Sequence, residues 1–303
     1  MADLSVNIAG VHFENPIIAA SGTIGFGHEY SEFYPLSTLG GISCKGITLK
    51  ERPGNPPPRI AETPSGMLNA VGLQNPGVDH FIKEDLPWLK KQGLVIIANA
   101  AGSTQEDYCE MAEKLSASDV DMIELNISCP NVKEGGVQFG TSCASVAAIT
   151  KAVRKHCTKP LIIKLSPNVS DIASIAKAAE AEGADAVSLI NTLTGMRIDI
   201  NTRRPIIKNI TGGMSGPAVF PVAVRMVWQV KNAVSIPVIG MGGITTWQDA
   251  VEMMIAGADA IQIGTALFTD PYAPVKIAKG LNDYLDKNNI KSVTELTQTV
   301  ITD

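Results

Sequence analysis

The chain has 303 residues, of which 45% are hydrophobic and only 5% aromatic, and its formal net charge is −5 at pH 7. This length is ordinary for a single α/β barrel, and a core of Val, Ile, Leu and Ala suits buried parallel strands. The negative charge argues against a nucleic-acid partner, which would require a basic surface.

Short apolar runs alternate with amphipathic stretches along the chain. After an expected hairpin (Ser5–Ile8 and Val11–Glu14), strands are predicted at Ile17–Ala20, Gly41–Cys44, Val95–Asn99, Met122–Asn126, Leu161–Leu165, Ala186–Asn191, Val238–Gly240 and Ala260–Gly264. Helices are predicted at Thr104–Leu115, Ser142–His156, Asp171–Glu182, Pro217–Val230, Thr246–Ile255 and Pro274–Leu285. Eight strands with intervening helices predict a (β/α)8 TIM barrel of the α/β class.

Two long stretches interrupt this alternation. Residues 51–77 are rich in proline and glycine and are expected to form a loop over the C-terminal mouth of the barrel. Residues 192–216 are expected to form a second long insertion. Long loops in a compact domain are more often functional than accidental. No linker or shift in composition divides the chain, so residues 1–303 are expected to form one domain.

Cysteine and histidine positions show no metal-ligand spacing, so metal or iron–sulfur ligation by this chain alone is not expected. The odd number of cysteines, five, fits a reducing cytoplasm. The first residues, Met1–Leu4, resemble no signal peptide, and no apolar run is long enough to span a bilayer. We therefore expect a cytoplasmic protein without a membrane partner.

Polar residues follow nearly every predicted strand, and in a barrel these strand ends meet at one mouth. In chain order they are Ser21-Gly22, Lys45-Gly46, Asn99, Asn126 through Asn131, Lys164, Asn191-Thr192, Gly242-Gly243 and Gly264-Thr265. The last two glycine-containing turns each lead into a predicted helix, so they predict a cradle for a phosphate, to which Gly216 could add a donor. Lys45 and Lys164 lie in apolar segments, where a lysine either meets an anionic or electron-rich ligand or reaches the barrel rim.

Cys129 is the strongest candidate for chemistry, because its motif places a thiol, a hydroxyl and two carboxamides after one strand. A thiol there can act as acid, base or nucleophile, and a buried structural cysteine is the alternative. The chain lacks a glycosidase-type acidic pair, a Gly-x-Ser-x-Gly elbow and the Gly-x-Gly-x-x-Gly pattern of NAD binding. The residues alone thus predict a phosphate-bearing ligand or cofactor, a small polar substrate and a cysteine acid or base, without naming the reaction.

Five motifs together resemble the dihydroorotate dehydrogenases over essentially the whole chain: Asn126-Ile127-Ser128-Cys129-Pro130-Asn131, Asn69-Ala70-Val71-Gly72-Leu73-Gln74-Asn75, Asn191-Thr192, Gly242-Gly243-Ile244 and Ile263-Gly264-Thr265. The resemblance implies an FMN-dependent barrel that oxidises (S)-dihydroorotate to orotate in de novo pyrimidine biosynthesis. It implies that Cys129 removes the C5 proton while hydride leaves C6 for flavin N5.

Implied substrate-binding residues are Lys45, Asn69, Ala70, Val71, Gly72, Leu73, Asn126, Asn131, Asn191 and Thr192. Implied FMN-binding residues are Ser21, Lys45, Gly46, Asn99, Asn126, Lys164, Ile190, Gly216, Gly242, Gly243, Gly264 and Thr265.

The cysteine base is similar to that of the soluble class 1 enzymes, and the segment Asn69–Gln74 is similar to their NAD-linked (1B) type. That type pairs the barrel with a subunit carrying FAD and a 2Fe-2S cluster, which implies a homodimer of barrels within a heterotetramer. A fumarate-linked enzyme, an FMN-dependent reductase of another pyrimidine base, a phosphate-binding lyase or isomerase, and a non-catalytic ligand-binding barrel remain alternatives. Residues Val132–Thr141 are expected to form a mobile lid over bound substrate, with a floppy surface loop as the alternative.

Overall fold

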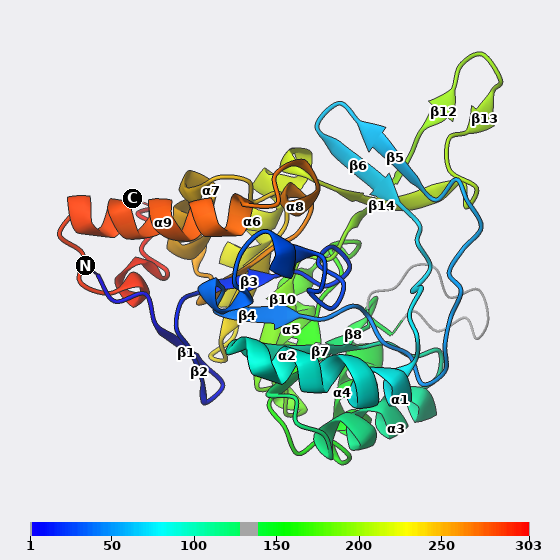
Figure 1. Ribbon diagram of the computed structural model, residues 1–303, viewed down its shortest axis with the longest axis horizontal. Coiled ribbons are helices and arrows are strands. Elements are labelled where there is room, and N and C mark those ends of the chain that lie inside the picture. The colour runs from blue at the N-terminus through cyan, green and yellow to red at the C-terminus, as the bar shows by residue number, and fades with distance from the viewer. Residues whose placement is uncertain (1, 128–138, 303) are drawn as a thin grey trace.

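The computed structural model describes residues 2–127 and 139–302. Eight parallel strands close into a barrel in the order β3, β4, β7, β8, β9, β10, β15, β16 (Figure 1). Their bounds are β3 (Ile17–Ala19), β4 (Gly41–Ser43), β7 (Val95–Ala100), β8 (Met122–Asn126), β9 (Leu161–Lys164), β10 (Ala186–Leu189), β15 (Val238–Met241) and β16 (Ala260–Ile263). The predicted barrel is therefore confirmed. Nearly every residue of these strands is buried, as expected where helices cover a parallel sheet and side chains fill its interior.

Within the described residues, six helices of ten residues or more surround the barrel, and each of them was predicted. They are α3 (Gln105–Ser116), α4 (Cys143–Arg154), α5 (Ile172–Ala181), α6 (Phe220–Lys231), α7 (Trp247–Ala256) and α9 (Ala273–Lys287). Helices α3, α4 and α7 begin with capping boxes at Thr104, Ser142 and Thr246, and α6 and α9 have proline in their first turn. These signals satisfy or remove backbone donors that a helix start leaves unpaired, which explains why the starts were readable from sequence.

Further elements complete the described chain. The N-terminal hairpin consists of β1 (Val6–Ile8) and β2 (Val11–Phe13), as predicted. A helical stretch that was not predicted precedes β7 and consists of α1 (Val78–His80), the π-helical turn η3 (Phe81–Asp85), α2 (Leu86–Leu89) and η4 (Lys90–Gln92). Single turns are η1 (Tyr30–Glu32), η2 (Leu36–Thr38), η5 (Pro217–Val219), α8 (Ala266–Thr269) and η6 (Val293–Leu296). In the described part of the chain, no helix has the length and apolar character needed to cross a membrane.

The prediction that the two long stretches are loops without secondary structure is wrong, because strands from the two stretches pair with each other. They contain β5 (Ile60–Thr63), β6 (Gly66–Asn69), β11 (Leu193–Met196) and β14 (Thr211–Ser215), which form an antiparallel sheet in the order β11, β14, β6, β5. A short hairpin, β12 (Ile198–Asp199) and β13 (Arg204–Pro205), extends beyond this sheet (Figure 1). The register pairs Asn69 with Gly213. Glycines favour strands poorly, so only this distant pairing makes β14 a strand.

Candidate functional site

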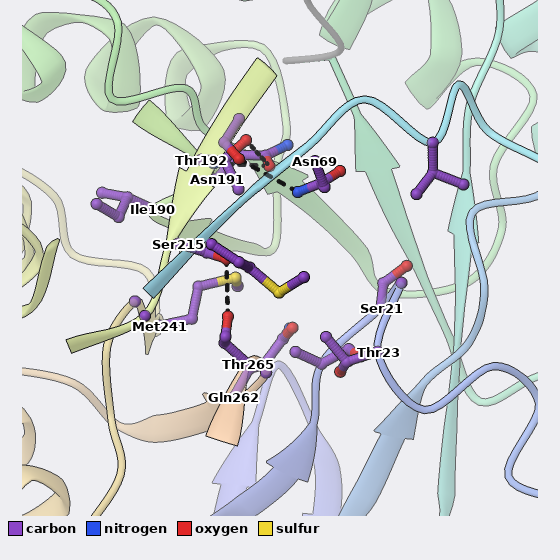
Figure 2. A pocket seen from close by; sticks show the side chains of 18 of the residues that line it. Ser21, Thr23, Asn69, Ile190, Asn191, Thr192, Ser215, Met241, Gln262 and Thr265 are labelled. Atoms are coloured by element: carbon purple, nitrogen blue, oxygen red, sulfur yellow. Dashed lines mark hydrogen bonds between the residues drawn. The ribbon is translucent and has the colours of Figure 1, made fainter. Parts of the chain in front are cut away.

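A cavity of about 520 Å³ lies at the C-terminal ends of the barrel strands. This volume falls within the roughly 300–1,000 Å³ of small-molecule sites. The ends of every barrel strand except β7 contribute described residues to its wall, and the small sheet contributes the opposite side. Figure 2 shows Asn69 of the small sheet on another side of the cavity from Ser21 of the barrel, while Ser215 of the small sheet accepts a hydrogen bond from Thr265 of the barrel at 2.8 Å. The loops that were expected to cover the mouth thus do so as a sheet.

Most of the predicted site residues line this one cavity. They are Ser21, Lys45, Gly46, Asn69, Val71, Gly72, Leu73, Asn126, Lys164, Ile190, Asn191, Thr192, Gly216, Gly242, Gly243, Gly264 and Thr265. Ala70 is not among them: it is fully buried against Leu68 and Ile207, on the side of the small sheet away from the cavity. Asn99 is also fully buried and lies behind the wall. Cys129 and Asn131 lie outside the described residues.

The expected lid also falls largely outside the described residues, which resume at Phe139. The Phe139 ring packs edge-to-face on Tyr108, with ring centroids 5.5 Å apart. The Tyr108 hydroxyl donates to the carbonyl of Asn126 at 2.7 Å. The end of the expected lid is therefore joined to the end of β8, and its motion stays a prediction.

Close approach of backbone segments shapes the predicted phosphate cradle. Gly243 has φ of +77°, and a Cβ there would lie 2.7 Å from Phe220 Cβ and 2.9 Å from the Gly216 carbonyl oxygen. Gly216 and Gly242 also have positive φ, of 103° and 121°. Only glycine adopts such conformations readily, so this turn brings backbone rather than side chains to the cavity wall.

The start of α7, into which the Gly242-Gly243 turn leads, uses several of its backbone donors within its own capping box. Asp249 Oδ2 accepts from the backbone N–H groups of Thr245 and Thr246, at 2.9 and 2.8 Å. Thr246 Oγ1 accepts in turn from the Asp249 N–H at 3.2 Å. These three donors are therefore used within the capping box, whereas the turns at Gly242-Gly243 and Gly264-Thr265 line the cavity.

A buried carboxylate, Glu124, lies in the barrel interior and was not recognised from sequence. Its Oε2 accepts from Ser43 Oγ at 2.8 Å and from Asn99 Nδ2 at 2.6 Å. Its Oε1 accepts from Ser188 Oγ and Gln262 Nε2, both at 2.8 Å. The sequence did hold a signal, because Glu124 is a charged residue within an apolar strand, and such residues are almost never buried without partners.

Lys164 approaches the same carboxylate, with Nζ 3.6 Å from Glu124 Oε2. Burial by itself would raise the pKa of Glu124, but the Lys164 charge and hydrogen bonds from Ser188, Ser43 and Gln262 hold that pKa below its ordinary value. Lys164 is only 5% exposed, so it does not reach the barrel rim. It meets an anion supplied by the protein itself while still lining the cavity.

Three carboxamides connect this carboxylate with the cavity wall. Asn99 Oδ1 accepts from Asn126 Nδ2 at 3.4 Å, and Asn126 Oδ1 accepts from Asn191 Nδ2 at 3.4 Å. Asn191 Oδ1 accepts from the backbone N–H of Thr192 at 2.8 Å. Each step runs in the same direction, from a donor nearer the mouth to an acceptor nearer the core. We call Asn99, Asn126 and Asn191 the carboxamide chain.

Comparison with known proteins identifies the family of the chain. The family model described as dihydroorotate dehydrogenase matches residues 3–285. The catalytic subunit of dihydroorotate dehydrogenase B (NAD(+)) from Alkaliphilus oremlandii is 56% identical over 294 residues, which cover 97% of both chains. The protein of the same name from Bacteroides thetaiotaomicron is 57% identical over 297 residues, which cover 98% of both chains.

A solved structure supports the fold independently. The crystal structure of a dihydroorotate dehydrogenase from Eimeria tenella in complex with ferulenol superposes with a TM-score of 0.81. It is 22% identical and covers 98% of this chain and 88% of its own. Identity this low bears on the fold alone. The family match over nearly the whole length and the two close relatives carry the assignment: the chain belongs to the dihydroorotate dehydrogenase family.

Proposed function

We propose that the chain is an FMN-dependent dihydroorotate dehydrogenase that oxidises (S)-dihydroorotate to orotate in pyrimidine biosynthesis. The observation that carries this proposal is that residues implied by five separate motifs line one cavity in a chain whose family match spans residues 3–285. The names of the close relatives specify NAD(+), which favours the NAD-linked type over the fumarate-linked type.

The described residues fit FMN. The backbone turns at Gly242-Gly243 and Gly264-Thr265 suit a phosphate, which binds well to exposed N–H groups. Apolar side chains such as Met241 and Ile190 suit a flat ring. Gln262 Oε1 is buried, has no hydrogen-bond partner among the described residues, and belongs to a side chain on the cavity wall. Buried acceptors are normally paired, and a ring N–H of a ligand would satisfy this one.

The chain's own residues would bind the substrate and move its proton, and bound FMN would supply the hydride acceptor. Asn69, Asn126 and Asn191 line the cavity, and carboxamides match the donors and acceptors of a flat pyrimidine ring. We assign proton removal at substrate C5 to the Cys129 thiolate. The support for this role is its motif, which begins at Asn126 on the cavity wall.

We further propose that electrons leave through a partner subunit carrying FAD and a 2Fe-2S cluster, in a cytoplasmic heterotetramer built on a dimer of barrels. The words "catalytic subunit" in the relatives' names support the existence of a partner. The test compares NAD+ reduction by the purified chain alone and with the partner added. Full-rate NAD+ reduction by the chain alone would contradict the partner's role.

An anaerobic titration tests the central proposal. The visible spectrum of the purified chain, supplied with FMN, is recorded before and after adding dihydroorotate. Bleaching of the flavin bands is expected. A flavin that stays oxidised would assign the site to another substrate, and failure to bind FMN would overturn the functional proposal.

A matched pair of cysteine variants tests the base. Cys129→Ser should retain the flavin spectrum but reduce the flavin about 10²–10⁴-fold more slowly, the scale of general-base losses. Cys143→Ser is the control, because Cys143 is exposed at the start of α4 and does not line the cavity. Equal rates for the two variants would show that Cys129 is not the base.

A further inference from the structure

We propose that Glu124 is a positioning residue, which as a carboxylate sets the direction of the carboxamide chain and the orientation of Gln262 and Lys164. Glu124 does not line the cavity and is fully buried. It would therefore act through side chains that touch the ligands. This inference rests on the proposed function, because those side chains are taken to contact FMN and substrate.

The described polar partners of the Glu124 carboxylate all donate to it or carry a positive charge. Each carboxylate oxygen receives one serine hydroxyl and one amide NH2 group: Ser43 and Asn99 at Oε2, Ser188 and Gln262 at Oε1. An ionised carboxylate only accepts hydrogen bonds. The two amides must therefore turn their NH2 groups toward Glu124 and their oxygens away from it.

The orientation of Asn99 then passes along the carboxamide chain. With its Nδ2 held by Glu124, Asn99 presents Oδ1 to Asn126, and Asn126 presents Oδ1 to Asn191. At the mouth the chain ends on the Thr192 backbone N–H, which can only donate. The Glu124 carboxylate at one end can only accept and the Thr192 N–H at the other end can only donate, so the hydrogen bonds of the carboxamide chain can run in one direction only. Turning any of the three amides over would place two donors or two acceptors against each other.

The other two contacts have separate consequences at the cavity. With its Nε2 on Glu124, Gln262 is left with Oε1 as a buried acceptor that has no hydrogen-bond partner within residues 2–127 and 139–302. Lys164 stays beside Oε2, at 3.6 Å, with 6% of its side chain exposed. A buried ion pair is weak evidence for a stabilising role, since apolar replacements are often as stable. The positioning role of Glu124 is indicated instead by its contacts with Gln262 and Lys164, which line the cavity.

Glu124→Gln is the direct test, because glutamine keeps the shape but carries one NH2 group. Whichever way this group points, it faces the NH2 of Asn99 or of Gln262, so one of those amides must turn over. The serines do not enforce direction, because a hydroxyl both donates and accepts. Ser188→Ala is therefore the matched control: it removes a 2.8 Å hydrogen bond to the same carboxylate from an equally buried residue but leaves the charge in place.

Two readouts separate positioning from a purely structural role. In Glu124→Gln the Kd of the apoprotein for FMN should rise on the order of tenfold or more, because a buried polar group at the site loses its partner. The midpoint potential of bound FMN should rise, because a negative charge that opposes flavin reduction is gone. Ser188→Ala should stay within about twofold of wild type in Kd and keep its potential, even if both variants lose thermal stability.

The inference would be overturned if Glu124→Gln and Ser188→Ala had the same Kd for FMN and the same midpoint potential of bound FMN. If Glu124→Gln does not fold, Gln262→Met replaces it, because Gln262 and Ser188 donate to the same oxygen at the same distance. The inference then predicts weaker FMN binding for Gln262→Met than for Ser188→Ala, and equal binding would overturn it. Wild-type protein that binds no FMN would instead refute the proposed function.

Discussion

Replacing Gly243 by alanine tests whether close backbone approach builds the phosphate cradle. At φ of +77°, alanine is disfavoured by about 1–2 kcal/mol. Its Cβ would also lie within 3.0 Å of three atoms, two of them backbone atoms that cannot move aside easily. Overpacking of this kind costs about 1–3 kcal/mol, and the reduced entropy of the unfolded chain returns about 0.4–1 kcal/mol.

The expected net loss for Gly243→Ala is therefore roughly 1–4.5 kcal/mol in the free energy of unfolding. Gly264→Ala is the matched control on the other turn of the cradle. Gly264 lacks the positive φ, and the atoms nearest to a Cβ there, Ala20 Cβ and Thr23 Cγ2, are 3.5 and 3.7 Å away. Its unfolding free energy should stay within about 1 kcal/mol of wild type.

The assay is urea unfolding of both apoproteins beside wild type, followed by FMN titration monitored by flavin fluorescence. Both variants should bind FMN more weakly if both turns hold its phosphate, but only Gly243→Ala should also be destabilised. A Gly243→Ala protein as stable as Gly264→Ala would refute the reasoning from backbone approach.

Three further predictions concern stability away from the cradle. Gly280→Ala in α9 should destabilise the protein in thermal unfolding by about 1–2 kcal/mol despite alanine's helix preference, because its Cβ would overlap Trp247, and a stabilised variant would contradict this packing. Thr104→Ala should lose about 1 kcal/mol with the α3 capping box and leave FMN affinity unchanged; an unaltered urea midpoint would argue against the cap. Burial raises the pKa of Tyr34 to about 12, so the neutral phenol's contribution to stability, complete below pH 10, is lost as pH rises from 10.0 to 12. Tyr34→Phe should flatten the fall in melting temperature over that range, and parallel curves would exclude Tyr34 as its source.

Local sequence patterns determined the barrel. The strands are short apolar runs and the helices carry capping residues such as Thr104 and Thr246, so both kinds of element were readable without tertiary information. Because parallel strands of a barrel present their carboxyl ends at one mouth, polar residues at those ends, such as Lys45 and Asn191, were also predictable as neighbours.

Only the tertiary structure decided which segments far apart in the sequence contact each other. The small sheet exists because Asn69 pairs with Gly213, and no local period marks β14 as a strand. The Glu124 contacts have the same origin: its partner Gln262 lies 138 residues further along the chain, and only closure of the barrel brings both to its centre. In sequence Glu124 is one charge in an apolar strand. Inside the barrel the carboxylate is removed from water, and burying it without partners would cost a large free energy. It therefore requires hydrogen-bond donors, and these donors must be oriented toward it.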